Sequence, residues 1–178
     1  MTNYAKHETG ERADIARETL SYDPETGEII RIKSDIRHPQ LVGKSACFEV
    51  EDVWRMKYFS LTIMYRQYMA HRVAWLLYYG SWPTMLIGHE DGDGRNNRIS
   101  NLRLVTNSQN AKNVKKVPSK SGHTGVRWHS IGKKWNARIK ADGVEHSLGL
   151  YDDIEDAIAA RKAAEVKYGF HPNHGKVR

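Results

Sequence analysis

A histidine followed by a series of asparagines is the feature of this sequence best able to do chemistry. His89 ends a short apolar segment, and a loop of Glu, Asp, Gly and Asn follows it, the residue types that favour turns. Asn101 and Asn110 come later in the chain. Imidazole exchanges protons near neutral pH, which makes His89 a candidate for acid–base chemistry.

Two short strands and a helix must position these side chains. Leu86 and Ile87 predict an apolar strand that runs into His89, and residues 102–105 alternate apolar and polar side chains, as a second strand does. Thr106 then opens a helix, with Gln109 three residues later to complete a capping box. The order is therefore strand, polar loop, strand and short helix, with the His and Asn side chains where the three elements meet.

These residues resemble the HNH nuclease family, in the phage and intron-homing branch that replaces the final His by Asn. The family core is a ββα unit that holds one divalent metal. The resemblance implies that His89 is the general base, that Asn101 ties the loop to the active site and that Asn110 is the metal ligand on the helix. The match extends over roughly 45 residues. The other residues that agree with the family are His71-Arg72-Val73-Ala74-Trp75, Gly80, Asn96-Asn97-Arg98 and Ser100 to Leu104.

The same resemblance implies a reaction, the hydrolysis of phosphodiester bonds in double-stranded DNA. Its cofactor would be Mg²⁺ or another divalent cation such as Mn²⁺. His89 would take a proton from the attacking water, while the metal, held by Asn110 and a phosphate oxygen, would stabilise the developing charge. Members of the family leave a 5′-phosphate and a 3′-hydroxyl.

Gly88 departs from the family at the position of the usual metal-ligand Asp. Mg²⁺ is normally held by one or two carboxylates, so the metal site reduces to Asn110 and the Gly88 position. Glu90 is a candidate substitute, although two residues of strand move a side chain about 6–7 Å. Two hypotheses stay open: an HNH endonuclease with impaired or inactivated catalysis, by a natural or an engineered change, and a catalytically inactive sequence-specific DNA-binding protein.

A second domain begins near Gly122. Asp142-Gly143 predicts a tight hairpin turn, Asp152 is the predicted N-cap of a helix, and Gly169 ends that helix. The predicted strands are 126–129, 135–140 and 144–148. The pattern therefore predicts a three-stranded sheet followed by one helix.

The two faces of this sheet differ in chemistry. Trp128 and Trp135 alternate in phase with the apolar positions, so we expect both to pack against the helix. The opposite face exposes mainly basic and polar side chains, namely Arg127, His129, Asn136, Arg138 and Lys140. Sheets of this kind can enter the major groove of DNA.

Residues 122–170 resemble the AP2 DNA-binding domain, in Gly125-Val126-Arg127, 132–135, 137–140, 148–151 and the Ala-rich helix. The resemblance implies DNA contacts by Arg127, Arg138 and Lys140, with His129 and Asn136 beside them. Glu145 and Ser147 depart from the family, so no target sequence carries over. Lys115 and Lys116 precede the domain in a basic linker that we expect to neutralise phosphates.

The N-terminal part is predicted to be rich in β structure. A helix near 11–20 and a hairpin with its turn at 23–27 come first, and residues 58–65 predict a strand. Tyr68 and Met69 are expected to lead into a helix at about 70–79, with Val73, Leu76 and Leu77 in the core. On that helix, His71 has two interpretations, a side chain packed under the ββα unit or an active-site contact, and we favour packing. Arg72 is expected to reach a phosphate or to lie on a solvated helix face.

The predicted fold class is α+β, with a ββα-metal HNH core and a small AP2-like sheet and helix. The predicted divisions are an N-terminal β-rich extension at 1–57, the HNH core at 58–113, a basic linker at 114–121, the AP2-like domain at 122–170 and a tail at 171–178.

Composition agrees with a polyanionic partner. The 178 residues contain 28 Lys and Arg against 21 Asp and Glu, for a net charge of +7. One cysteine, Cys47, excludes a disulfide framework within the chain. No membrane span or signal peptide is evident, and we expect no small-molecule substrate. An HNH core with an AP2 domain is typical of mobile phage endonucleases, so we expect a phage-encoded protein in the cytoplasm of its bacterial host.

Overall fold

The computed structural model describes residues 7–34, 38–53, 55–113 and 120–175. The chain forms two compact units, Met1–Leu104 and Val105–Arg178, and each is considered by itself. Lys115 and Lys116, with most of the predicted linker, lie outside the described residues. No helix in the described ranges is long and apolar enough to cross a membrane.

The first unit begins with helix α1 (Gly10–Thr19) and an antiparallel hairpin of β1 (Leu20–Tyr22) and β2 (Ile29–Arg31). Gly27 closes the hairpin turn with a φ of +79°, and its N–H donates to the Asp23 carbonyl at 2.8 Å. Glycine adopts such positive φ values without steric cost. The hairpin predicted around 23–27 is therefore confirmed.

A three-stranded antiparallel sheet follows the short 3-10 helix η1 (Pro39–Leu41). Its strands, in spatial order, are β3 (Phe48–Glu51), β4 (Lys57–Ile63) and β5 (Arg66–Met69). The strand predicted over 58–65 ends early because Met64 and Tyr65 turn the chain with φ values of +46° and +60°. Tyr68 and Met69 lead into a helix at Ala70, as predicted, but they also belong to strand β5, which the sequence did not predict. Tyr68 pairs with Leu61 across the sheet and is buried.

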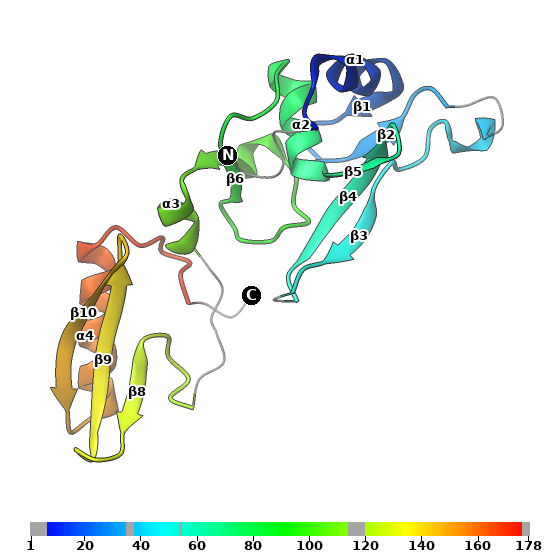
Figure 1. The fold of residues 1–178 in the computed structure, drawn as a ribbon. Coiled ribbons are helices and arrows are strands. Elements are labelled where there is room, and N and C mark those ends of the chain that lie inside the picture. The colour runs from blue at the N-terminus through cyan, green and yellow to red at the C-terminus, as the bar shows by residue number, and fades with distance from the viewer. Residues whose placement is uncertain (1–6, 35–37, 54, 114–119, 176–178) are drawn as a thin grey trace. The chain divides into compact units, whose positions relative to one another are not determined.

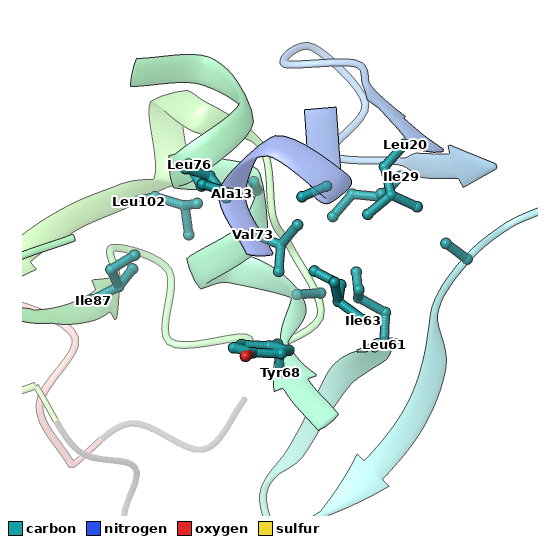
Figure 2. Close-up of a cluster of buried hydrophobic side chains, with 14 residues drawn as sticks. Ala13, Leu20, Ile29, Leu61, Ile63, Tyr68, Val73, Leu76, Ile87 and Leu102 are labelled. Atoms are coloured by element: carbon teal, nitrogen blue, oxygen red, sulfur yellow. The ribbon is translucent and has the colours of Figure 1, made fainter. Parts of the chain in front are cut away.

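Helix α2 (Ala70–Tyr79) lies at the centre of the first core, as its apolar stripe predicts. Gly80 ends it in the left-handed conformation. Val73 and Leu76 are fully buried, and Leu77 packs against the same cluster. Figure 2 shows Val73 and Leu76 among side chains of the surrounding elements, including Ala13, Leu20, Ile29, Leu61 and Ile87.

The predicted order of strand, loop, strand and helix is present. Strand β6 (Leu86–His89) pairs with β7 (Leu102–Val105), and a 3-10 turn, η2 (Ile99–Asn101), precedes β7. Helix α3 (Asn107–Ala111) begins at Thr106, and both hydrogen bonds of the predicted capping box with Gln109 form. Because the chain divides after Leu104, α3 belongs to the second unit.

The second unit contains the predicted three-stranded antiparallel sheet and helix (Figure 1). The strands are β8 (Val126–His129), β9 (Lys134–Ala141) and β10 (Val144–Tyr151), with β9 in the middle. Helix α4 (Ile154–Lys167) packs on one face, against Val126 and Ala137.

Two details of this domain differ from prediction. The N-cap of α4 is Asp153, whose side chain accepts from the Glu155 N–H at 2.8 Å, whereas Asp152 pairs with Lys134 at 3.1 Å. Trp135 packs against the core beneath α4, but Trp128 is 50% exposed. Trp128 lies opposite Trp135 in register, but on the edge strand β8, where the helix does not cover it fully.

Candidate active site

His89 lies at the end of β6 and is only 7% exposed. Its Nε2 atom lies 3.3 Å from Oδ1 of Asn97, which is itself 2% exposed. An amide oxygen accepts hydrogen bonds, so this contact favours the tautomer with the proton on Nε2. Nδ1 is then the nitrogen that can accept a proton from a reactant.

Burial lowers the pKa of His89 below its usual value. The hydrogen bond with Asn97 and the carboxylates of Asp91 and Asp93 act in the opposite direction but do not outweigh the burial. The neutral imidazole therefore predominates at neutral pH, and this is the form that a general base requires.

Asn101 ties together the two ends of the loop that follows His89. Its Oδ1 accepts from the Asp91 N–H at 3.0 Å, and its Nδ2 donates to Asp91 Oδ1 at 3.0 Å and to the Asn96 carbonyl at 2.8 Å. Its own carbonyl accepts from the Glu90 N–H at 2.9 Å. The structure thus brings His89 and Asn101 into one loop, and it assigns the hydrogen bond on the His89 ring to Asn97.

Two further aromatic rings surround His89. The His71 ring meets it edge to face at 5.1 Å between centroids, and the Tyr58 ring lies 6.3 Å from His89 and 6.2 Å from His71. The Nδ1 atom of His71 is buried and has no hydrogen-bond partner among the described residues. Burial, with His89 and Arg72 nearby, holds the pKa of His71 well below its usual range, so this ring stays neutral.

Comparison with known proteins identifies the same segment. Residues 68–112 match the family described as HNH endonuclease. This segment of the chain is therefore similar to the HNH endonuclease family. The matched segment includes His71, His89 and Asn101 and extends through α3.

Two curated relatives come from phages or prophages. Protein 3.8 of Escherichia phage T7 is 33% identical over 70 residues, 39% of this chain and 58% of that protein. The SPbeta prophage-derived putative HNH homing endonuclease YosQ of Bacillus subtilis (strain 168) is 30% identical over 110 residues, 61% of this chain and 58% of that protein. The matched regions thus span 58% of each relative's length. No solved structure matches.

HNH nucleases generally use a divalent metal, but the described side chains of this domain do not fit such a site well. Gly88 has no side-chain ligand atom, and the carboxylate of Glu90 pairs with Arg103 at 3.2 Å. The carboxylate of Asp91 accepts hydrogen bonds from Asp93, Asn96 and Asn101.

Across the described ranges, no group of three or more His, Cys, Asp or Glu side chains could hold a metal ion. Burial raises the pKa of Asp91, but the hydrogen bonds that its carboxylate accepts lower it on balance below the usual value. Asn110 is exposed on α3 in the second unit. The assignment of Asn110 and the Gly88 position to a metal stays a prediction.

Helix α3 is held by the turn between β9 and β10. Asp142 accepts from Ser108 Oγ at 2.7 Å and pairs with Lys112 Nζ at 3.2 Å. The Lys112 carbonyl also accepts from the His171 N–H at 3.0 Å. These contacts explain why α3 groups with the C-terminal sheet.

The sequence suggested that Arg72 contacts a phosphate or lies on a solvated helix face. The structure instead buries it. Its side chain is 6% exposed and forms an ion pair with Glu8, with Nη2 to Oε2 at 2.7 Å. It also donates to the carbonyls of Met85 at 3.1 Å and Pro83 at 2.9 Å. Arg72 therefore fixes the chain that leads into β6, and no phosphate contact is needed to explain it.

The five sheet residues predicted to contact DNA share one face. Arg127 pairs in register with Asn136 and His129 with Lys134, while Arg138 and Lys140 follow on the same face of β9. Arg127 and Lys140 are exposed, and the other three are partly exposed. Arg138 forms an ion pair with Glu145 at 2.8 Å. Their contact with DNA stays a prediction.

Sequence reasoning missed Asn97 and Tyr58 as parts of the site and treated His71 as packing. Asn97 stands directly beside Asn96 in a loop with several asparagines, and only the three-dimensional contact distinguishes the two. Tyr58 comes from a different sheet, more than thirty positions before His89 in the sequence, so local spacing gave no signal for it.

Proposed function

We propose that the protein is a homing-type HNH endonuclease that hydrolyses phosphodiester bonds of double-stranded DNA, with catalysis impaired by Gly88. One observation carries the proposal: within the segment that matches the HNH family, a buried neutral His89 is oriented by Asn97 in a loop that Asn101 ties together. This is the geometry of a general base held in one orientation.

The proposed chemistry assigns one proton transfer to this chain. His89 Nδ1 takes a proton from a water molecule as the water oxygen bonds to phosphorus. The bond from phosphorus to the 3′-oxygen breaks, and that oxygen takes a proton from solvent. The products carry a 5′-phosphate and a 3′-hydroxyl.

We further propose that the C-terminal sheet selects the site, in the manner of an AP2 domain. Its open face presents Arg127, Arg138 and Lys140 with His129 and Asn136, and the chain has a net charge of +7. Cationic side chains on such a face neutralise phosphates, while sheet side chains can read base edges in the major groove. We also propose that the protein acts inside a bacterial host cell, and the phage and prophage origins of the two relatives support this.

Gly88 explains why catalysis would be weak. It lies in β6, an extended conformation that residues with a side chain also adopt, directly before His89. A carboxylate at this position would supply the hard oxygen ligand that Mg²⁺ or Mn²⁺ requires. Gly88→Asp is therefore expected to increase metal-dependent cleavage.

The rival proposal is a DNA-binding protein without nuclease activity. The absence of a carboxylate at Gly88 and the ion pair of Glu90 with Arg103 favour it. Under this view the open sheet face still binds DNA, while the HNH domain serves as scaffold.

The experiment that separates these proposals is cleavage of a supercoiled DNA panel in Mg²⁺. The chain would be compared with its Gly88→Asp and His89→Ala variants. Cleavage that increases in Gly88→Asp supports the impaired nuclease. DNA binding without cleavage by any of the three proteins would favour the rival.

A further inference from the structure

We propose that the β1–β2 hairpin, which lies outside the HNH-matched residues, positions His89 by holding the backbone of Asn97. The inference rests on the proposed function, since it concerns the orientation of the proposed general base. It assigns Tyr22 and Gly27 as positioning residues, in a part of the chain to which nothing in the HNH match gives a role.

The hairpin contacts the segment 97–99 through three hydrogen bonds. The Tyr22 hydroxyl donates to the Asn97 carbonyl at 2.7 Å, and the Ile99 N–H donates to the Pro24 carbonyl at 3.1 Å. Arg98 Nε donates to the Glu25 carbonyl at 2.7 Å. Each residue from 97 to 99 therefore has a bond to the β1 strand or to the turn that follows it.

Gly27 brings the turn into direct backbone contact with the same segment. A Cβ atom at Gly27 would lie 2.6 Å from the Arg98 nitrogen and 2.7 Å from the Asn97 carbonyl carbon. Real Cβ atoms do not approach backbone so closely, so a larger residue at 27 must displace either the turn or residues 97 and 98. The absence of a side chain at Gly27 is what allows the hairpin to approach so closely.

Asn97 links the hairpin to His89, because its backbone is held by the hairpin and its side chain contacts the imidazole ring. Its carbonyl faces the hairpin, and its side-chain Oδ1 faces the His89 Nε2 at 3.3 Å. At 2% exposure, the Asn97 side chain has little room to adjust independently of its backbone. Burial also raises the pKa of Tyr22, so its hydroxyl keeps the proton that it donates.

The other side of the loop is also packed. A Cβ atom at Gly94 would overlap the Tyr58 ring, and that ring packs beside His89 and His71. The loop thus fits between the β1–β2 hairpin and strand β4. Displacement on the hairpin side cannot be relieved by a simple shift toward Tyr58, and the hydrogen bond to His89 changes instead.

The test measures the tautomer of His89 by ¹⁵N NMR of histidine-labelled protein at neutral pH. The His89 signals are assigned by their loss in His89→Ala. Gly27→Ala is compared with Gly43→Ala, because both glycines have a φ of +79° but a Cβ at Gly43 meets nothing within 4 Å. The two variants therefore share the backbone strain and differ in the contact with Asn97.

We expect the single Nε2–H tautomer in the unmodified chain and in Gly43→Ala, and a mixture of tautomers in Gly27→Ala. Tyr22→Phe, which removes one hydrogen bond and keeps the ring, should change the ratio in the same direction by less. It also keeps the test valid if Gly27→Ala does not fold. Unchanged His89 signals in folded Gly27→Ala, or in Tyr22→Phe where Gly27→Ala is unfolded, would overturn the proposal.

A second readout uses cleavage in a Gly88→Asp background. Misplacing a reacting group by about 1 Å can cost roughly 100-fold in rate, so Gly27→Ala should lower kcat by about ten- to a hundred-fold and leave DNA affinity unchanged. Gly43→Ala should keep its kcat. If Gly88→Asp does not cut DNA, the proposed function fails, while the NMR comparison still decides the role of the hairpin.

Discussion

The polar side chains of interest are buried in the first unit of this protein and exposed in the second. In and beside the loop that follows His89, the side chains of His89, Asn97 and Asn101 are each at most 7% exposed and are fixed by hydrogen bonds. On the open sheet face, Arg127 and Lys140 are exposed, and Arg138 forms an ion pair with the 55% exposed side chain of Glu145.

The difference agrees with the two roles that we propose for these regions. A reacting group must be held in place before the substrate arrives, and burial with hydrogen bonds achieves that. A surface that attracts a phosphate backbone works through charge that stays accessible to ions and water. Mutations should therefore affect folding and chemistry in the first unit, and affinity in the second.

The largest expected effect on stability is the loss of the buried ion pair between Glu8 and Arg72, compared with loss of the exposed ion pair between Glu145 and Arg138. Glu8→Gln removes the partner of Arg72, whose side chain is 6% exposed, and should lower the free energy of unfolding by about 3–5 kcal/mol, because a buried charge is left uncompensated. Glu145→Gln removes the partner of Arg138 on the sheet face and should cost about 0–1 kcal/mol. Urea unfolding measures both.

The same pair of variants also sharpens the contrast in binding. Glu145→Gln removes a negative charge beside Arg138 and should tighten binding to DNA, whereas Glu8→Gln at a temperature where it stays folded should not. Equal losses of stability in the two variants would contradict the contrast between the units.

A pH dependence should distinguish the first unit from the second. Burial lowers the pKa values of His71 and His89, so the unfolded chain binds protons at a higher pH than the folded unit does. The two histidines therefore contribute fully to stability above about pH 6.5, the usual pKa of an exposed histidine. Below that pH the free energy of unfolding decreases, by up to about 1.4 kcal/mol per pH unit for each histidine. Urea unfolding of the first unit between pH 7.5 and 5 measures this.

The control for that measurement is His71→Phe, which keeps a ring and removes one titrating group. Its stability should depend less steeply on pH than that of the unmodified chain. A stability independent of pH in the unmodified chain would show that these histidines are accessible to protons in the folded unit.

The smallest effect concerns the open sheet face. Arg127→Ala and Lys140→Ala should each weaken DNA binding and lower the log–log salt slope by about 0.9, the value for one phosphate contact. Unfolding curves should hardly change, since both side chains are exposed. Lys162→Ala on the exposed surface of α4 is the matched control. A salt slope that Arg127→Ala and Lys140→Ala leave unchanged would remove this face from the proposed DNA interface.

Local patterns in the sequence predicted most of the elements. The capping box of Thr106 and Gln109, the apolar stripe of α2 and the alternation in β9 each depend on neighbours within a few residues, and each is present. Strand β5 was missed because two non-glycine residues, Met64 and Tyr65, make its turn.

Contacts between distant segments were not predictable in this way. The ring cluster around His89 draws on Tyr58 and His71, and the buried charge of Arg72 is matched by Glu8, 64 positions earlier. The fixing of Asn97 by Tyr22 spans 75 positions. The family resemblance pointed to His89 and Asn101, whose hydrogen-bond partners lie in the same loop. The rings beside His89 and the hydroxyl that holds Asn97 come from segments that only the fold brings together.

The most direct test of the central claim is the rate at which Gly88→Asp cleaves supercoiled DNA in Mg²⁺, compared with the double variant Gly88→Asp/His89→Ala. General-base catalysis contributes about 10²–10⁴-fold, so the single variant should cut at least about 100-fold faster than the double variant. Equal rates, or no cleavage by either protein across a panel of phage and bacterial DNA, would contradict the assignment of this loop as a nuclease active site.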